Sequence, residues 1–208
     1  FDGFSVSGER MKNREEAENL AASCRREGSA SIGKIVQTEK TEKPPALYDL
    51  TTLQREANRV LGYTAQQTLD YVQALYEKKL VTYPRTDSRY LTEDMAGMLP
   101  ELATVTAVFC FPEAGTVSAN AGQVINSKKV TDHHAIIPTK EVQNCILFDL
   151  PQGELEILKL IAKRLLTAVS APCRYAETTA EIFCGGIAFK AKGKTVLSAG
   201  WKGMEEKC

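Results

Sequence analysis

Two proline breaks divide this sequence of 208 residues into a central part with helix signals and two flanks with strand signals. Pro44 and Pro45 form the first break, and Pro172 forms the second. A proline fixes its own backbone φ and has no N–H to donate, so regular structure tends to end where it stands. Because strand signals occur on both sides, the sequence predicts an α+β fold in which a mainly helical domain is inserted into one strand-rich domain. The predicted bounds are 1–45 and 172–208 for the strand-rich domain and 46–171 for the helical domain.

The flanks carry one helix pattern and three strand patterns. Residues 13–26 have apolar side chains at helical spacing, with acids early and arginines late, as the helix dipole favours. Residues 29–38 are rich in β-branched side chains, and 175–183 alternate small or apolar side chains with polar ones. Gly185-Gly186 predicts a hairpin turn into a further strand at 187–191. Strands on both flanks indicate one discontinuous domain.

Helix signals dominate the central part. Thr51 with Gln54, and Thr64 with Gln67, fit the capping-box pattern, in which a hydroxyl caps a backbone amide and the glutamine reaches back. We therefore expect two helices, joined by a short turn into a helix-turn-helix-like hairpin. Further helices are expected from about residue 92 and over 151–170.

The composition is that of a globular protein without an overall basic field. Hydrophobic residues make up 43% and charged residues 25%, and Lys plus Arg equal Asp plus Glu at 26 each. Any nucleic-acid site must therefore be local. The six cysteines include no Cys-x-x-Cys pair and do not cluster with the two histidines, which argues against a zinc site.

The thiol pattern also favours a cytoplasmic location. Cysteines dispersed through a chain of this length do not indicate a disulfide framework, so a reducing compartment is expected. The sequence has no signal peptide and no apolar run long enough to cross a bilayer, and no membrane partner is expected. The chain does not begin with methionine, and we expect it to be an internal fragment of a longer protein.

The segment 82–91 sets a tyrosine and an arginine two residues apart. Pro84 biases Tyr83 toward extended backbone, which displays the phenol on a loop instead of winding it into a helix. The planar guanidinium of Arg85 can hold a phosphate while the tyrosine hydroxyl attacks it. Two simpler interpretations stay open on these residues alone: Tyr83 packs in an ordinary turn, and Arg85 forms a surface ion pair with a nearby aspartate.

Three motifs, in this order, resemble the active-site region of type IA DNA topoisomerases: 48–58, 82–91 and 131–139. The topoisomerase I branch carries Met where this chain has Pro84, and Glu and Arg where it has His134 and Ile137. The resemblance is therefore to the bacterial topoisomerase III branch. It is specific over about 40–140 and weaker in the flanks. It implies that the helical domain carries the catalytic tyrosine and that the strand-rich domain belongs to the arch of the enzyme's toroid.

The resemblance implies a DNA transesterification. Tyr83 would attack a backbone phosphate of single-stranded DNA and form a 5′-phosphotyrosine link, and the freed 3′-hydroxyl would reseal the strand after strand passage. Such a cycle relaxes or decatenates DNA without a nucleotide cofactor. A phenol has an ordinary pKa of about 10 and is a poor nucleophile at neutral pH. Arg85 would therefore stabilise the charge on the phosphate, an effect of about 10² to 10³ in rate.

The resemblance also implies roles for the two histidines of the chain, which are adjacent. His133 aligns with the histidine that helps to position the scissile phosphate, whereas His134 aligns with a position that varies between branches. Neighbouring residues on extended backbone point to opposite sides, so no more than one of them is expected to face Tyr83. The expected catalytic residues are Tyr83, Arg85 and His133, and the expected DNA-binding residues are Arg85, Ser88, Arg89, Gln54 and His134.

Two alternatives from other function classes are weighed against this one. Asp132-His133-His134 also occurs in a family of metal phosphoesterases, but such sites need further ligands, and this sequence has neither a third histidine nor an Asp-x-Asp pair. No metal site is therefore expected in this chain. The other alternative is a non-catalytic helix-turn-helix-like DNA-binding module, in which Tyr83 merely packs.

The resemblance places Mg²⁺ outside this chain. In the resembled family the metal is bound by an acidic cluster on a separate Toprim domain, and no such cluster is found in this sequence. The fragment is therefore expected to be inactive alone. Its expected partners are single-stranded DNA and the remaining domains of the same enzyme, at the nucleoid of the bacterial cytoplasm.

Overall fold

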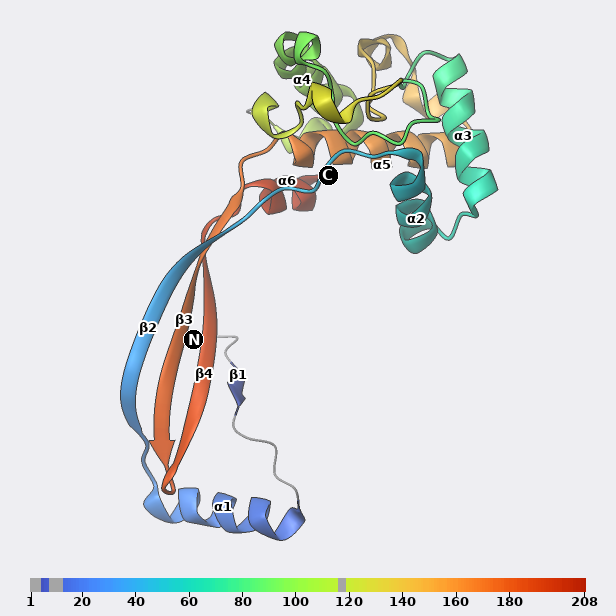
Figure 1. The fold of residues 1–208 in the computed structure, drawn as a ribbon. Helices are drawn as coiled ribbons and strands as arrows, with labels where there is room; N and C mark the ends of the chain where they lie inside the picture. The colour runs from blue at the N-terminus through green and yellow to red at the C-terminus, as the bar shows by residue number, and fades with distance from the viewer. Residues whose placement is uncertain (1–4, 8–12, 116–118) are drawn as a thin grey trace. The chain divides into compact units, whose positions relative to one another are not determined.

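The computed structural model describes residues 5–7, 13–115 and 119–208. The chain divides into two compact units. The sheet unit comprises Phe1–Glu42 and Cys173–Ser198, and the helical unit comprises Lys43–Pro172 and Ala199–Cys208. α-Helices and an antiparallel sheet are both present, which confirms the predicted α+β class (Figure 1).

The sheet unit is built on four antiparallel strands in the order β1-β4-β3-β2. The strands are β1 (Ser5–Ser7), β2 (Ser31–Glu42), β3 (Cys173–Cys184) and β4 (Ile187–Ser198). Gly185 and Gly186 join β3 to β4 with φ values of 59° and 76°, left-handed conformations that glycine adopts without strain. The long strands run past the predicted ranges because β3 pairs with both neighbours over most of its length.

Helix α1 (Arg14–Glu27) precedes β2 and lies where the sequence predicts a helix. The side chain of Asn13 accepts a hydrogen bond of 2.8 Å from the backbone N–H of Glu16, which caps the first turn. Gly28 ends the helix at a φ of 67°. Within the described residues, no helix is long and apolar enough to span a membrane.

The helical unit is assembled around α5. Its helices are α2 (Leu50–Leu61), α3 (Ala65–Glu77), α4 (Leu99–Cys110), α5 (Gln152–Ala168) and α6 (Trp201–Lys207). The long helix α5 contacts each of the other four (Figure 1). A 3₁₀ helix at Glu93–Met98 leads into α4, and shorter 3₁₀ turns lie at 112–114, 121–123, 127–129, 140–144 and 147–149.

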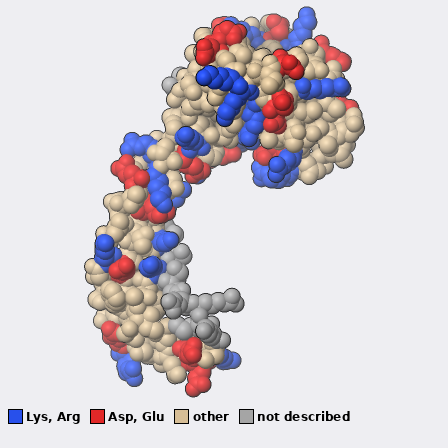
Figure 2. All heavy atoms as spheres, in the orientation of Figure 1, with Lys and Arg blue, Asp and Glu red and all other residues tan. Residues whose placement is uncertain are grey.

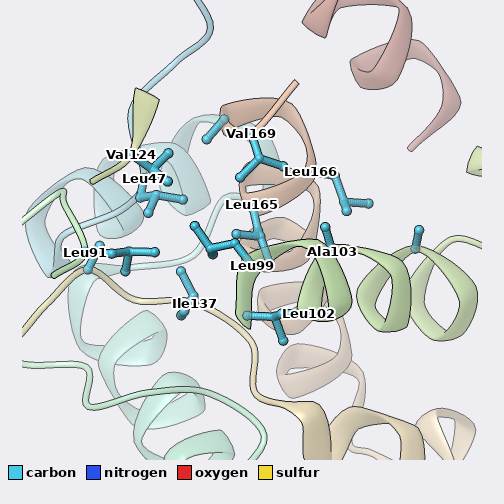
Figure 3. Packing of buried hydrophobic residues seen from close by; sticks show 13 residues of the cluster. Leu47, Leu91, Leu99, Leu102, Ala103, Val124, Ile137, Leu165, Leu166 and Val169 are labelled. Carbon is cyan, nitrogen blue, oxygen red and sulfur yellow. The ribbon is translucent and has the colours of Figure 1, made fainter. Parts of the chain in front are cut away.

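Two clusters of buried apolar side chains form the core of this unit. The first joins α4 and α5 to the loops that carry Leu47, Leu91 and Ile137 (Figure 3). The second joins α2, α3 and α5 around the buried Tyr48 and Ile136. The loops that hold the three sequence motifs therefore contribute to the core itself, which fixes where their polar side chains lie.

The start of α2 differs from the prediction. Asp49, not Thr51, caps this helix: its carboxylate accepts from the Thr52 N–H at 2.6 Å, and the Thr52 hydroxyl accepts from the Asp49 N–H at 3.2 Å. The predicted box at Thr64 and Gln67 is confirmed, with reciprocal hydrogen bonds of 3.1 and 2.9 Å. At the start of α2, the sequence allows a cap by either Asp49 or Thr51, and the carboxylate of Asp49 is the stronger hydrogen-bond acceptor.

The C-terminal end also differs. The sequence assigns 172–208 to the strand-rich domain, whereas Ala199–Cys208 groups with the helical unit and contains α6. The Trp201 N–H donates to the Ala171 carbonyl at 2.8 Å, and Met204 and Cys208 pack against the first core cluster. A helix of seven residues has too little periodicity to be recognised in a sequence.

Candidate active site

Main-chain hydrogen bonds hold the three sequence motifs against one another. The motifs at 48–58, 82–91 and 131–139 are far apart in the chain but share backbone partners. The linking bonds are Ile136 N–H to Tyr48 O (2.9 Å), Thr82 N–H to Ile137 O (3.0 Å), Ala135 N–H to Tyr90 O (3.0 Å) and Leu50 N–H to Thr86 O (3.1 Å). The resulting frame is made of backbone, so it does not depend on the side chains that it displays.

Threonine hydroxyls fasten the loop on both sides of Tyr83. The Thr82 hydroxyl donates to the Ala135 carbonyl at 3.1 Å and accepts from the Ile137 N–H at 3.0 Å. The Thr86 hydroxyl donates to the His133 carbonyl at 2.7 Å. Sequence reasoning assigned no such role to Thr82, because its partners lie more than fifty residues away.

Tyr83 packs against two aromatic rings. Its ring centroid lies 4.3 Å from that of His133, with the ring planes tilted by 45°. Tyr76, from the last turn of α3, meets it edge-on at a centroid distance of 5.4 Å. These contacts fix the ring of Tyr83, which is half-buried, while its hydroxyl forms no hydrogen bond with any described residue. The position of the phenol oxygen is therefore fixed by the ring contacts, while the oxygen itself has no hydrogen-bond partner among the described residues.

Arg85 is exposed and lies on the same loop as Tyr83. In the described part of the chain it has neither an ion pair nor a hydrogen bond, so the interpretation of a surface ion pair with an aspartate is wrong for this structure. Arg85 and His133 line an open cleft of about 640 Å³. Asp49, Asp87 and Asp132 also line it, so the cleft alone does not offset the charge of a phosphodiester.

His134 is placed differently from its neighbour. Its ring nitrogen Nδ1 lies 2.8 Å from the carbonyl oxygen of Ala135, and the side chain is half-buried. His133, in contrast, is exposed and stacks on Tyr83. The two adjacent imidazoles thus have different surroundings, as expected for neighbours on extended backbone.

The remaining predicted DNA-binding residues make hydrogen bonds within the protein. Ser88 is 4% exposed, and its hydroxyl donates to the Lys129 carbonyl at 2.8 Å. Arg89 donates from Nε to the Leu47 carbonyl at 3.0 Å, and the Gln54 carboxamide donates to the Ala65 carbonyl at 3.0 Å. Ser88 and Gln54 therefore shape the loops around the site and are not gathered with Tyr83, Arg85 and His133.

The site contains no evident metal centre. Within residues 5–7, 13–115 and 119–208, no group of three or more His, Cys, Asp or Glu side chains is arranged to hold a metal ion. No chemical step at Tyr83 is therefore assigned to a metal ligand of this chain. Figure 2 shows acidic and basic side chains interspersed over the visible face of the helical unit, in keeping with the balanced composition.

Comparison with protein families decides which family this arrangement represents. A family model described as DNA topoisomerase matches residues 2–207. The chain belongs to the type IA DNA topoisomerases. DNA topoisomerase 3 of Bacillus subtilis (strain 168) is 42% identical over 182 residues, which cover 84% of this chain and 25% of that relative. DNA topoisomerase 3 of Bacillus licheniformis is 40% identical over 216 residues, covering 98% of this chain and 29% of the relative.

These relatives confirm the topoisomerase III branch, and this topoisomerase chain spans 25 to 29% of their length. A solved structure, full-length topoisomerase I from Thermotoga maritima, matches with a TM-score of 0.65 over 95% of this chain and 32% of that chain. Its identity is 22%, so this likeness shows the fold. The comparisons favour neither the metal phosphoesterase nor the non-catalytic DNA-binding module that the sequence left as alternatives.

Proposed function

We propose that this chain is the nucleophile-bearing part of a type IA topoisomerase that cleaves and reseals one strand of DNA through Tyr83. The observation that carries the proposal is the geometry of Tyr83: its ring is fixed at 4.3 Å from His133, while its hydroxyl and the nearby guanidinium of Arg85 have no partner among the described residues. A held but unpaired nucleophile beside an unpaired cation is the arrangement that attack on a phosphate requires.

The proposed step exchanges one phosphodiester for another. The Tyr83 oxygen forms a bond to phosphorus and loses its proton to solvent or a base, and the bond from phosphorus to the 3′-oxygen of the preceding nucleotide breaks. That oxygen takes up a proton and leaves as a 3′-hydroxyl, while the 5′-phosphate stays on Tyr83. Resealing is the reverse reaction, so the cycle needs no nucleotide cofactor.

Arg85 and His133 are proposed to act on the phosphate. The guanidinium can donate two parallel hydrogen bonds to the non-bridging oxygens, and the imidazole can donate one from a ring N–H. Both groups line the open cleft next to Tyr83. Positive charge aimed at developing negative charge is the usual source of acceleration at such a site.

Several parts of the reaction are proposed to come from outside this chain. Three aspartates line the cleft, so further positive charge is needed to hold DNA there. We propose that a Toprim domain of the same enzyme supplies Mg²⁺ and closes over Tyr83. The sheet unit would form part of the arch, the substrate would be single-stranded DNA, and the complete enzyme would relax or decatenate DNA at the bacterial nucleoid.

Covalent capture tests the proposal. The full-length enzyme is incubated with a single-stranded oligonucleotide that carries its label at the 3′ end, on the part of the strand that stays attached to the protein. The mixture is then denatured and the protein is separated on a gel. The wild type should become labelled, and Tyr83→Phe should not, because the substitution removes one hydroxyl and leaves the ring packing. Tyr90→Phe is the matched control and should stay labelled. Attachment that persists in Tyr83→Phe, or disappears in Tyr90→Phe, would contradict the assignment.

A further inference from the structure

A second cleft in the helical unit is lined by arginines. It has a volume of about 310 Å³, enough for a phosphate group, and lies beside the first turns of α2. Its four arginines come from three different segments of the chain: Arg55 and Arg59 from α2, Arg89 from the loop after Tyr83, and Arg164 from α5. Figure 2 shows basic side chains at the α2 corner of the unit.

The charges in this cleft are not balanced. Glu56 is the single carboxylate among the lining residues, and it pairs with Arg59 at 2.6 Å and lies 3.9 Å from Arg164. Four guanidiniums and one carboxylate therefore line this cleft, and Glu205 of α6 adds a second acidic neighbour for Arg59, in a chain whose formal net charge is zero. The cleft next to Tyr83 has the opposite balance, with three aspartates and one arginine. Holding like charges together costs free energy that a bound anion recovers.

Two arginines of this cleft are held by hydrogen bonds within the protein, and a third is exposed. Arg164 donates to the Tyr48 hydroxyl at 2.9 Å and to the Ala46 carbonyl at 3.3 Å, and its guanidinium lies 4.2 Å from the centre of the Tyr48 ring. Arg89 is fastened by its bond to the Leu47 carbonyl. Arg55 is exposed and has no partner among the described residues. A guanidinium fork of this kind is the group that proteins use to bind phosphate oxygens.

We propose that the arginine cleft binds a second backbone phosphate of the DNA strand, apart from the phosphate that Tyr83 attacks. This inference rests on the proposed function, because it assigns the cleft to the same strand. Neighbouring residues of the first turn of α2 line the two clefts, Thr51 the cleft next to Tyr83 and Thr52 the arginine cleft. A strand that crosses this turn from one cleft to the other would meet the arginines, whose charge would provide the attraction that the aspartate-lined cleft does not.

Salt dependence of binding tests the inference in the full-length enzyme. The affinity for a fluorescent single-stranded oligonucleotide of 12 nucleotides is measured by anisotropy at several salt concentrations. Each phosphate contact on single-stranded DNA contributes about 0.7 to the slope of log affinity against log salt. Arg55→Gln should make the fall of log affinity with log salt shallower by about that amount. It should also weaken binding by about 3- to 10-fold at 0.1 M salt. Arg55→Lys should retain the wild-type slope, since it keeps the charge.

Arg25→Gln is the matched control for the loss of one charge. It removes an exposed arginine from α1, in the sheet unit, and should bind as the wild type does. If Arg55→Gln and Arg25→Gln have the same slope as the wild type, or if the wild type does not bind the oligonucleotide, the inference is wrong. Failure of the proposed function is read separately, as the absence of labelled wild-type protein in the covalent-capture experiment.

Two further probes identify the occupant. Inorganic phosphate and a polyglutamate peptide are each titrated into wild type and Arg55→Gln, and thermal unfolding is followed. With a DNA strand as the occupant, the oligonucleotide slope depends on Arg55, whether or not 1 mM phosphate also raises the melting temperature of the wild type more than that of Arg55→Gln. A rise that depends on Arg55, together with unchanged DNA slopes, would assign the cleft to a free phosphate or to an acidic protein segment and overturn the inference.

Discussion

Tyr83 and Arg85 are positioned by their neighbours, not by contacts of their own polar atoms. The hydroxyls of Thr82 and Thr86 bond to the backbone of 133–137 on either side of the pair, and the rings of Tyr76 and His133 hold the phenol from two directions. Among the described residues, the Tyr83 hydroxyl and the Arg85 guanidinium form no hydrogen bond that would have to break before the proposed substrate binds. Their side chains are therefore expected to tolerate substitution without loss of fold, which makes the site suited to mutational tests.

The first prediction at this scale concerns Arg85. Arg85→Lys keeps the charge but replaces a planar fork with a point charge, so only one phosphate oxygen is held at a time. In the full-length enzyme, oligonucleotide affinity should change by less than about threefold, while the rate of covalent attachment falls by about 10-fold or more. Rapid-quench measurement of attachment, beside anisotropy for binding, separates the two effects. An equal loss in both would indicate a role in binding alone.

The second prediction distinguishes the two histidines. If the His133 ring holds the phosphate, His133→Ala should slow covalent attachment by about 10-fold or more, because a hydrogen-bond donor to the phosphate is lost. His134→Ala should keep the wild-type rate, because the His134 ring bonds to the backbone of Ala135, whereas His133 lies against Tyr83.

Attachment rates and melting temperatures of the three proteins decide the assignment. A wild-type rate in His133→Ala with a slower one in His134→Ala would transfer the role to His134. If His133 served only to pack against Tyr83, its removal would lower the melting temperature and leave the attachment rate unchanged.

Sequence patterns singled out Tyr83, Arg85 and the two histidines, because each is a chemical group with a motif around it, and their roles in catalysis stay predictions. They did not predict that Ser88 and Gln54 turn their polar atoms inward. The partners of these two side chains are carbonyls of Lys129 and Ala65, whose positions depend on tertiary structure. Of the four arginines in the second cleft, Arg89 was predicted to bind DNA, but the sequence did not show that Arg164, 109 positions after Arg55, completes a cleft with it.

At the scale of elements, α5 and the loop before α2 are joined by a buried tyrosine. Tyr48 is 1% exposed, and burial raises its pKa to about 12, although the guanidinium of Arg164 opposes part of that rise. The hydroxyl accepts from Arg164 and thereby links the second core cluster to the arginine cleft. The protonated phenol is therefore the form that the native structure favours.

This link predicts alkaline destabilisation. An unfolded tyrosine loses its proton near pH 10, while native Tyr48 keeps its proton until about 12, so its contribution to stability is complete below pH 10 and is lost between pH 10 and 12. Tyr48→Phe should lower the free energy of unfolding at pH 7 by about 1 to 2 kcal/mol, through the lost bond to Arg164. Urea unfolding at pH 7 and pH 11 should show this deficit shrinking at the higher pH; a constant deficit would contradict the prediction.

Element boundaries were predictable where local chemistry sets them and not elsewhere. Thr64 and Gln67 cap α3 as their spacing indicates, and Gly185-Gly186 makes the expected turn. The helix expected from about residue 92 is instead a 3₁₀ helix followed by α4, with Pro100 in the first turn of the α-helix, where a missing N–H is tolerated. Leu99 and Leu102, in the first turn of α4, are buried in the same core cluster as Leu165 of α5, a tertiary contact that the sequence pattern does not show.

For the whole molecule, proline breaks and strand patterns predicted the α+β class. The last ten residues were assigned to the wrong unit, because their position after a strand was taken as the guide. Residues 199–208 follow a strand in the chain and were assigned with it, yet α6 packs against α5 and returns to the helical unit. The chain therefore passes three times between the units, at 42–43, 172–173 and 198–199. An odd number of passages leaves the two ends of the chain in different units.

The return of α6 predicts that the helical unit folds without the sheet unit. The Trp201 N–H bonds to the Ala171 carbonyl at 2.8 Å, so the two ends of the excursion through β3 and β4 meet inside the helical unit. Both core clusters lie wholly within it. A chain that starts at Lys43, with 173–198 replaced by four Gly and Ser residues, should therefore keep its helical circular-dichroism spectrum and unfold in one cooperative thermal transition.

Gly200 provides the control for this prediction. Its φ is 53°, and a Cβ added to it would lie 2.4 Å from the carbonyl oxygens of both Ala171 and Pro172. Gly200→Ala in the shortened chain should therefore lower the melting temperature by several degrees, because either the backbone or the junction must move. If the shortened chain shows no cooperative transition, the helical unit needs the sheet unit to fold. If it folds but Gly200→Ala changes nothing, the two ends are not held together at this junction.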